Sequence, residues 1–345
     1  MAEGERMATI CNACRYCEGY CAVFPALERR RTFTAGDLRY LANLCHNCAE
    51  CYYACQYAPP HEFAVNFPKI LAEIRLESYR RNAWPAPLGF GFRRNGLLVS
   101  LILGIALAAA IAFAPRPAGA ADFYAVVPHN LMVAVYGGVS VLVLAALAMG
   151  LRRFWRDSGG GTAGFAALRR SCDDALRLRY LASGGAGCTY PDQHHSQLRR
   201  WFHHFTFYGF ALCFAATSVA AFYHYAFHWL APYGYFSLPV ILGSAGGVGL
   251  LIGPAGLLWL RIHRDSALGD SRQNGLDLAF LALLLATSLT GLLLLALRGT
   301  PAMPLLLAIH LAVVLAFFLT LPCGKFVHGM YRWAALLRNA KEGIK

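Results

Sequence analysis

The first 55 residues contain the same cysteine pattern twice, and this pattern uses eight of the chain's twelve cysteines. Each copy reads C-x2-C-x2-C-x3-C. The copies consist of Cys11, Cys14, Cys17 and Cys21, and of Cys45, Cys48, Cys51 and Cys55. Zinc sites use two C-x2-C pairs, which is a different spacing. A disulfide framework needs an oxidising compartment, and we expect no secretory signal before Cys11. The pattern therefore predicts metal-bound thiolates.

The spacing is that of two-cluster bacterial ferredoxins, in which the fourth cysteine of each run ligates the cluster held by the other run. We therefore expect one [4Fe–4S] cluster on Cys11, Cys14, Cys17 and Cys55, and a second on Cys45, Cys48, Cys51 and Cys21. Ferredoxins have a proline directly after the fourth cysteine, whereas this chain has Ala22 and Gln56. A short helix is expected over 35–44, between the two runs. The domain is thus either a compact βαβ ferredoxin or a helical cluster domain, as in the iron–sulfur subunits of fumarate reductase-like enzymes.

The rest of the chain has the composition of a membrane protein. Hydrophobic residues are 57% and charged residues 14%, against about 25% charged in soluble domains. Apolar runs close to the ~20 residues that a helix needs to cross the hydrocarbon lie at 96–114, 130–151, 204–223, 237–260, 276–297 and 304–323. We therefore predict a mainly α-helical protein with a cluster domain over 1–80, a linker over 81–95 and a six-span transmembrane bundle over 96–345.

Basic residues are concentrated in the cytoplasmic loop expected at 152–200, in the loop at 261–275 and in the tail, and the formal net charge is +13. By the positive-inside rule these segments and both termini are expected to face the cytoplasm. The basic loops are expected to contact anionic membrane lipid, or to attract an acidic patch on a protein partner. Nucleic-acid binding is not expected, because aromatic residues are not interleaved with lysine and arginine.

Histidines at the ends of the apolar runs are candidate haem ligands, because ionisable side chains are costly within a membrane and are usually functional there. His310 lies early in the sixth span and His328 just beyond its end, 18 residues later. This separation is five helical turns, or about 27 Å, so both share one face of the helix. Two haems at different depths would each need an axial imidazole from two helices. His129, at the outer start of the second span, is a weaker candidate. The alternative is that these histidines anchor helix ends or bind quinone.

The third span offers the partner ligands for these two histidines. His203 or His204 stands at its cytoplasmic end and His224 at its outer end. Antiparallel packing then predicts a cytoplasmic-side haem between His328 and either His203 or His204. It predicts an outer-side haem between His310 and His224. The helical phase relative to His224 slightly favours His203 over His204.

The doubled cysteine pattern and four later segments resemble the tricarballylate utilization protein B family, also called the citrate utilization protein B family. The segments are RRWFHHFTFYGFALCFAATSVAAFYHY (199–225), GPAGLLWL (253–260), TSLTGLLLLALR (287–298) and HLAVVLAFFLTLPCGKFVHGMYRW (310–333). The resemblance covers nearly the full length. The last segment also resembles the closing helix of the gamma-type cytochrome b subunit of nitrate reductase, which implies that His310 and His328 are haem ligands.

The family resemblance implies a membrane electron-transfer protein. It would pass electrons from a FAD-dependent dehydrogenase on a separate chain, which oxidises tricarballylate to cis-aconitate, through the two clusters and one or two b-type haems to the quinone pool. A flavin on another chain agrees with the sequence, because no G-x-G-x-x-G lies between a strand and a helix. No catalytic group stands out either, so we expect no substrate chemistry in this chain itself.

Two alternatives fit the same cysteine pattern. The first is the same relay with a different donor, linked to heterodisulfide or sulfite, because the sequence of a carrier hardly encodes its partner's substrate. The second is a membrane redox sensor, in which the clusters report redox state and the spans only anchor; such a protein needs no aligned histidines. A tricarboxylate transporter is disfavoured, because the spans contain few charges and no pair of broken helices.

Overall fold

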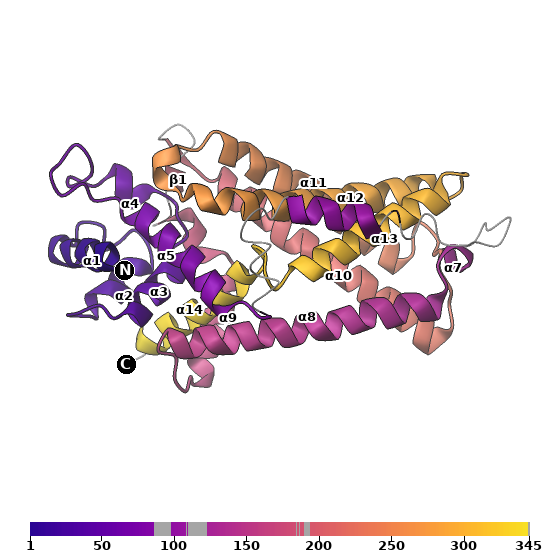
Figure 1. The fold of residues 1–345 in the computed structure, drawn as a ribbon, viewed down its shortest axis with the longest axis horizontal. Helices are drawn as coiled ribbons and strands as arrows, with labels where there is room; N and C mark the ends of the chain where they lie inside the picture. The colour runs from indigo at the N-terminus through magenta and orange to yellow at the C-terminus, as the bar shows by residue number, and fades with distance from the viewer. Residues whose placement is uncertain are drawn as a thin grey trace.

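The computed structural model describes residues 1–85, 98–107, 109, 123–183, 185, 187–189 and 194–343. The regular structure of this part of the chain is almost entirely helical, as predicted. The molecule is elongated (Figure 1): the N-terminal helices form one end, and the long helices of the remaining chain run away from them along the longest axis. Both termini lie at the end that the N-terminal helices form.

The N-terminal domain is helical and contains no strand among residues 1–85, all of which the structure describes. Its helices are α1 (Ala2–Cys14), α2 (Val23–Glu28), α3 (Ala35–Leu44), α4 (Glu50–Tyr53) and α5 (Phe67–Asn82). The helix predicted at 35–44 is confirmed as α3. A capping box begins it: the Asp37 amide donates to Thr34 Oγ1 at 3.2 Å, and the Thr34 amide donates to Asp37 Oδ2 at 3.3 Å. The domain is therefore the helical form and not a compact βαβ unit.

Among the described residues, five helices are long and apolar enough to cross a membrane, which fits a multi-pass membrane protein. They are α8 (His129–Asp157), α10 (Leu198–Phe227), α11 (Leu238–Ile262), α12 (Asn274–Leu297) and α13 (Met303–Thr320). Large apolar side chains on them are exposed, as expected for a lipid-facing surface; examples are Val141, Leu144, Phe214 and Phe222.

The first predicted span, at 96–114, is described in part. Its described portion includes an apolar helix over Leu98–Leu107. Most of the remaining residues of that prediction lie outside the described residues, as do residues 86–95 of the predicted linker. The six-span count therefore stays a prediction.

The segment 152–200 is not a simple loop, contrary to the prediction. α8 continues to Asp157, and α10 already begins at Leu198. Both helices extend past the apolar runs because arginine, which ends a hydropathy run, is itself a good helix former. At the end of α8, Arg156 also suits the helix C-terminus. Between them lie α9 (Phe165–Leu176), the 3-10 helix η1 (Arg179–Ala182) and the antiparallel strands β1 (Cys188–Thr189) and β2 (His195–Ser196). Other connections contain α7 (Phe123–Val126), η2 (Ser266–Leu268) and η3 (Ser271–Gln273).

The chain turns between α13 and a separate last helix, α14 (Val327–Gly343). The prediction that His310 and His328 share one face of a continuous helix is therefore wrong. The helix ends because Pro322 has no amide hydrogen to continue it, and the Gly324 amide closes the turn by donating to the Thr320 carbonyl at 2.7 Å. α14 then lies beside the N-terminal domain, where the chain ends (Figure 1).

Glycines bring α10 and α11 into close contact. A Cβ at Gly246 would lie 2.8 Å from the backbone nitrogen of Cys213. A Cβ at Gly253 would lie 2.6 Å from the backbone nitrogen of Thr206. Because only glycine leaves room for such approaches, these residues set the position of α10 and of the histidines on it.

The helix α14 is packed into the core of the N-terminal domain. Its Ala335 and Leu336 belong to the same buried cluster as Leu38 and Leu41 of α3 and Ile74 of α5. Burying such side chains stabilises the contact by about 1.5–3 kcal/mol each. The last helix therefore contributes to the core of the N-terminal domain.

A buried ion network adds to this contact. The guanidinium groups of Arg30 and Arg338 each lie 2.8 Å from the Asp37 carboxylate, and they reach Glu342 at 2.7 and 2.8 Å. Both also lie over the ring of Tyr40, at 4.9 and 4.3 Å from its centre. Burial opposes the ionisation of Asp37, but hydrogen bonds, first of all from Arg30, outweigh it and lower its pKa to about 2.

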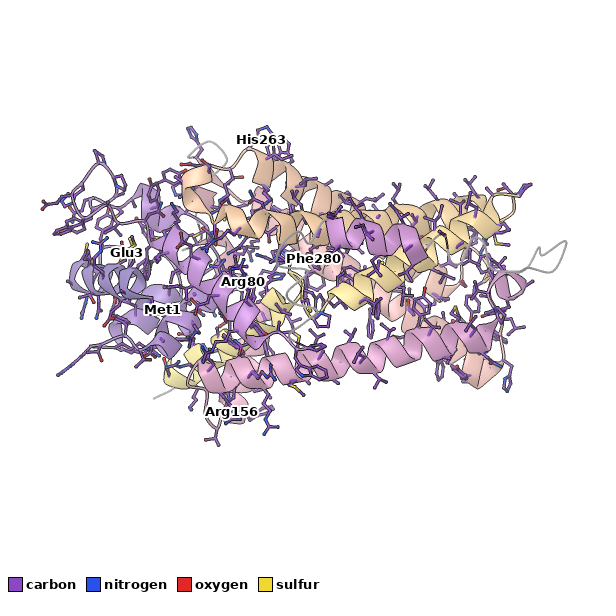
Figure 2. All side chains as sticks on the ribbon, in the orientation of Figure 1. Met1, Glu3, Arg80, Arg156, His263 and Phe280 are labelled. Atoms are coloured by element: carbon purple, nitrogen blue, oxygen red, sulfur yellow. The ribbon has the colours of Figure 1, made fainter. Side chains whose placement is uncertain are left out.

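Replacing Asp37 by Asn is expected to destabilise the protein by about 2 kcal/mol, because charged hydrogen bonds from two arginines are lost. The folded pKa of about 2 lies below the ordinary 3.8, so the carboxylate's contribution is present at neutral pH and is lost as the pH falls through about 2. The measurement is the thermal midpoint in detergent at neutral pH. Glu3→Gln, which removes an exposed pair with Arg6 (Figure 2), is the control and should change little. Equal shifts for the two variants would contradict the role of the network.

Candidate functional site

The eight motif cysteines line two pockets in the N-terminal domain. The cysteines of the first pocket, whose space of about 440 Å³ is partly open to solvent, are Cys11, Cys14, Cys17, Cys51 and Cys55. Those of the second pocket, whose space of about 400 Å³ is also partly open to solvent, are Cys21, Cys45, Cys48 and Cys51. The structure thus brings Cys55 to the first run and Cys21 to the second, while Cys51 borders both. Among the described residues, no three His, Cys, Asp or Glu side chains converge closely enough to hold a single metal ion. The motif thiols instead surround the two pockets.

Unusual backbone conformations shape the second cysteine run. Asn47 and Ala49 have positive φ angles of 55° and 69°, which residues other than glycine rarely adopt except where function requires it. The turn directs the Asn47 amide at the Cys45 sulfur, at 3.3 Å. Such N–H···S bonds tune the potentials of iron–sulfur clusters. Phe24 and Phe67 border both pockets and make their walls apolar.

Burial suppresses the ionisation of these thiols as long as they are free. Burial, helped by the neighbouring Cys55 thiol, raises the pKa of Cys11 and of Cys17 to about 12. Burial also raises the pKa of Cys48 to about 11, with Cys188 as the next cause. A bound metal reverses this, because its charge stabilises the thiolate. Sulfur donors around an apolar space are the donor set of iron–sulfur clusters, so the residues present fit such a group.

The β1–β2 hairpin covers the second cysteine run, which the sequence pattern did not indicate. The Thr189 amide donates to the Cys48 carbonyl at 3.2 Å, and Thr189 Oγ1 donates to Glu50 Oε2 at 2.5 Å. His195 Nε2 lies 2.8 Å from Glu50 Oε1. Cys188 is buried in the same apolar cluster as Cys48. These contacts join residues about 140 positions apart, so no local pattern could have predicted them.

A large pocket lies between the N-terminal domain and the membrane helices. It encloses about 2220 Å³, part of it open to solvent, and its lining is mostly apolar. Phe207 and Phe210 of α10 and Phe280 of α12 contribute to it. Phe280 marks its position near the middle of the molecule in Figure 2. His46 and Asn47 border both this pocket and the second cysteine pocket, so these two residues form a shared wall.

Two of the predicted histidines face each other in the large pocket. The ring centres of His203 and His328 are 6.1 Å apart, and two metal–nitrogen bonds of about 2 Å in line would place them roughly 6 Å apart. His328 Nδ1 donates to the Lys325 carbonyl at 2.6 Å, which leaves Nε2 as the basic nitrogen. Burial lowers the pKa of His328 well below its ordinary value, so the imidazole is neutral, as a ligand must be. His203 Nδ1 is buried without a hydrogen-bond partner. This pair fits an axially ligated haem.

The alternative ligand His204 does not line this pocket. Its ring stacks on Tyr208 with centres 5.9 Å apart, and its Nδ1 donates to the Arg200 carbonyl at 2.9 Å. Of the two neighbouring histidines, the structure therefore places His203 opposite His328.

The outer histidines are arranged differently from the prediction. His224 stacks on His129, the weaker candidate, with ring centres 3.9 Å apart. His310 Nδ1 instead lies 3.0 Å from Thr290 Oγ1 of α12. Both ring nitrogens of His129 and Nδ1 of His224 are buried without a hydrogen-bond partner. A separation of 3.9 Å leaves no room for a metal ion between the rings, which would need roughly 6 Å.

Two arginines that the sequence analysis treated only as topology charges connect the cysteine domain to the histidine pair. Arg199 donates to the carbonyls of His46 and Asn47, at 2.7 and 3.1 Å. Arg332 donates to the Cys45 carbonyl at 2.8 Å. Each lies four residues, or about one helical turn, from His203 or His328. That spacing is the sequence signal that could have indicated their role.

The fold and pockets define a multi-pass membrane protein with a ferredoxin-like cysteine domain. The family model of the citrate utilization protein B Fer4-like domain matches residues 4–81, and the model of citrate utilization protein B matches residues 91–345. The citrate utilization protein B of Escherichia coli is 52% identical to this chain over an alignment of 349 positions. The alignment covers 99% of this chain and 92% of that protein. No solved structure matches. The chain therefore belongs to the citrate utilization protein B family, as the sequence resemblance predicted, and this indicates an iron–sulfur electron-transfer role.

Cysteine variants are expected to group by pocket and not by sequence motif. If each pocket holds one cluster, Cys21→Ser and Cys48→Ser should give one electron paramagnetic resonance spectrum after anaerobic reduction. Cys14→Ser and Cys55→Ser should give another, and each variant should lose about half of the non-haem iron. Cys172→Ser is the control, because Cys172 lies on α9 and lines neither cysteine pocket, and it should keep the wild-type spectrum. A spectrum of Cys21→Ser that matches Cys14→Ser would contradict the exchange of fourth ligands.

Proposed function

We propose that the protein is the membrane electron-transfer subunit of a flavoprotein:quinone oxidoreductase in the bacterial inner membrane. It takes electrons from a FAD-dependent dehydrogenase on a separate chain and delivers them to the quinone pool, with two [4Fe–4S] clusters and b-type haem as carriers. The observation that carries this proposal is the shared wall of His46 and Asn47 between the second cysteine pocket and the pocket of His203 and His328. Redox groups in these two pockets would be neighbours.

The pockets support the following sets of ligands. The first cluster would be held by Cys11, Cys14, Cys17 and Cys55, and the second by Cys45, Cys48, Cys51 and Cys21. The haem would be held by His203 and His328. When bound, these groups supply one-electron chemistry, which divides the two electrons of a reduced flavin into single transfers.

The chain's own residues prepare these sites. The Lys325 carbonyl orients His328 through Nδ1 and fixes which ring nitrogen is the donor. The phenylalanines of the large pocket make part of its surface apolar, and apolar surface around a redox group is one of the means by which a protein sets a potential. The Asn47 amide does the same at the Cys45 sulfur by a hydrogen bond.

The donor would dock on the cysteine domain. Tyr16, which borders the first cysteine pocket, is 66% exposed, so a partner protein can approach this pocket directly. Both termini lie at this end of the molecule (Figure 1), which supports a common cytoplasmic side. Family membership supports a donor that oxidises a tricarboxylate, with tricarballylate to cis-aconitate as the proposed reaction.

His129, His224 and His310 are candidates for a second haem. Such a haem would require the stacked rings of His129 and His224 to separate.

The test is an anaerobic reduced-minus-oxidised optical spectrum of the detergent-purified protein, with iron, acid-labile sulfide and haem quantified together. We expect about eight non-haem irons with matching sulfide, together with the sharp bands of a b-type haem. Iron and sulfide without haem would overturn the histidine assignment and leave a cluster protein anchored in the membrane.

Histidine variants locate the haem. His203→Ala and His328→Ala are each expected to abolish the b-type bands, because each removes one axial ligand. His204→Ala is the matched control on the same helix and should keep them. Iron and sulfide content, measured on the same samples, reports whether the cysteine domain is still folded. Unchanged haem in both of the first two variants would show that the pocket is not the haem site.

A further inference from the structure

The helix α9 carries an exposed row of apolar side chains. Phe165, Leu168 and Leu176 are 79%, 39% and 50% exposed, and Cys172, which lies between them in sequence, is partly exposed. With 3.6 residues per turn, these four positions fall within an arc of about 80° of the helix surface, and they extend over about 16 Å of its length. These four residues are called the α9 stripe below.

The other two sides of α9 have different surroundings. One side packs against α14, where Ala167 is buried in the same apolar cluster as Leu337. The remaining side is polar: Arg169 is exposed, and Asp173 and Arg177 form an ion pair of 2.7 Å at the surface. The α9 stripe therefore lies outside the contact with α14. In the part of the chain that the structure describes, its large side chains are left uncovered.

The C-terminal end of α9 is attached to the membrane helix α10. Tyr208 Oη donates to the Leu176 carbonyl at 2.9 Å, and Arg200 Nη2 donates to the Arg177 carbonyl at 3.4 Å. This end of α9 therefore lies beside the first three turns of α10, which begins at Leu198. α9 also lies beside α14, where the N-terminal domain meets the long helices (Figure 1).

The side of α10 at this level is exposed and aromatic. Trp201, Phe205 and Tyr208 are 62%, 42% and 44% exposed, and their spacing of four and three residues places them on one side of the helix. Tryptophan and tyrosine are enriched where a membrane meets water, and the apolar run of this span begins at residue 204. Because Tyr208 also binds the end of α9, the α9 stripe adjoins the lipid-facing surface of α10.

We propose that α9 lies at the membrane surface, with Phe165, Leu168 and Leu176 inserted among the lipids on the side that faces the cysteine domain. Interfacial helices have this arrangement, with large apolar side chains on one side and arginines on the polar side. A bilayer fits the α9 stripe better than a protein partner does, because the α9 stripe adjoins a surface that already faces lipid. Since α9 packs on α14, which docks into the N-terminal domain, this insertion would hold the cysteine domain in a fixed orientation above the bilayer.

Photo-crosslinking from single positions tests what surrounds the α9 stripe. p-Benzoylphenylalanine replaces Phe165 or Leu168 in the full-length protein, which is reconstituted into nanodiscs of phosphatidylethanolamine and phosphatidylglycerol and irradiated. We expect the intact mass of a fraction of each variant to increase by the mass of one phospholipid.

Two control positions make the result decisive. Phe214 is 65% exposed in the middle of α10, so p-benzoylphenylalanine at this position should form the same lipid adduct. Ala166 is exposed on the polar side of α9, so p-benzoylphenylalanine there should form none. Gel filtration of each variant shows whether its fold is retained.

Three results would overturn the proposal. The first is a lipid adduct at Phe214 but none at Phe165 or Leu168. The second is an equal yield of adduct at Leu168 and Ala166, which would mean that α9 presents no particular side to the lipid. The third is a crosslink from Leu168 to another protein, or to a second copy of this chain, in place of lipid when the variants are irradiated in cells. That result would assign the α9 stripe to a protein interface.

Discussion

The docking of α14 into the N-terminal domain is the contact on which the rest of the structure depends. Leu336 lies in the core of that domain, and Arg338 is bound to Asp37 at 2.8 Å. The same helix carries His328 near its start, and His328 lines the large pocket between the N-terminal domain and the membrane helices. One element of 17 residues therefore sets the relation between the cysteine pockets and the histidine pair. Loss of its docking would displace His328 and so disturb this relation.

The shared wall explains why the cysteine domain and the membrane part act as one unit. His46 and Asn47 follow directly on Cys45, and their carbonyls are held by Arg199 of α10. Burial lowers the pKa of His46 well below its ordinary value, so the His46 imidazole is neutral. The positive charge next to this wall comes from arginines such as Arg199.

Much of this organisation could be predicted from the sequence, because the relevant signals are local. The cysteine spacing predicted which fourth cysteine would approach which run, and hydropathy predicted the positions of five apolar helices. The prediction of one continuous helix through His310 and His328 was wrong, because an apolar run does not reveal that Pro322 and Gly324 redirect the chain. The extra length of α8 and α10 was also missed, since charged residues end a hydropathy run without ending a helix.

The sequence by itself determined the kinds of ligand, the membrane character and the family of this protein, because each depends on residue type and short-range spacing. Only the tertiary structure decided that His203 and not His204 faces His328, that His224 stacks on His129, and that the α9 stripe adjoins α10. These relations depend on how helices far apart in the chain approach one another. Close packing at glycines and the docking of α14 govern that approach, and neither leaves a periodic signal in the sequence.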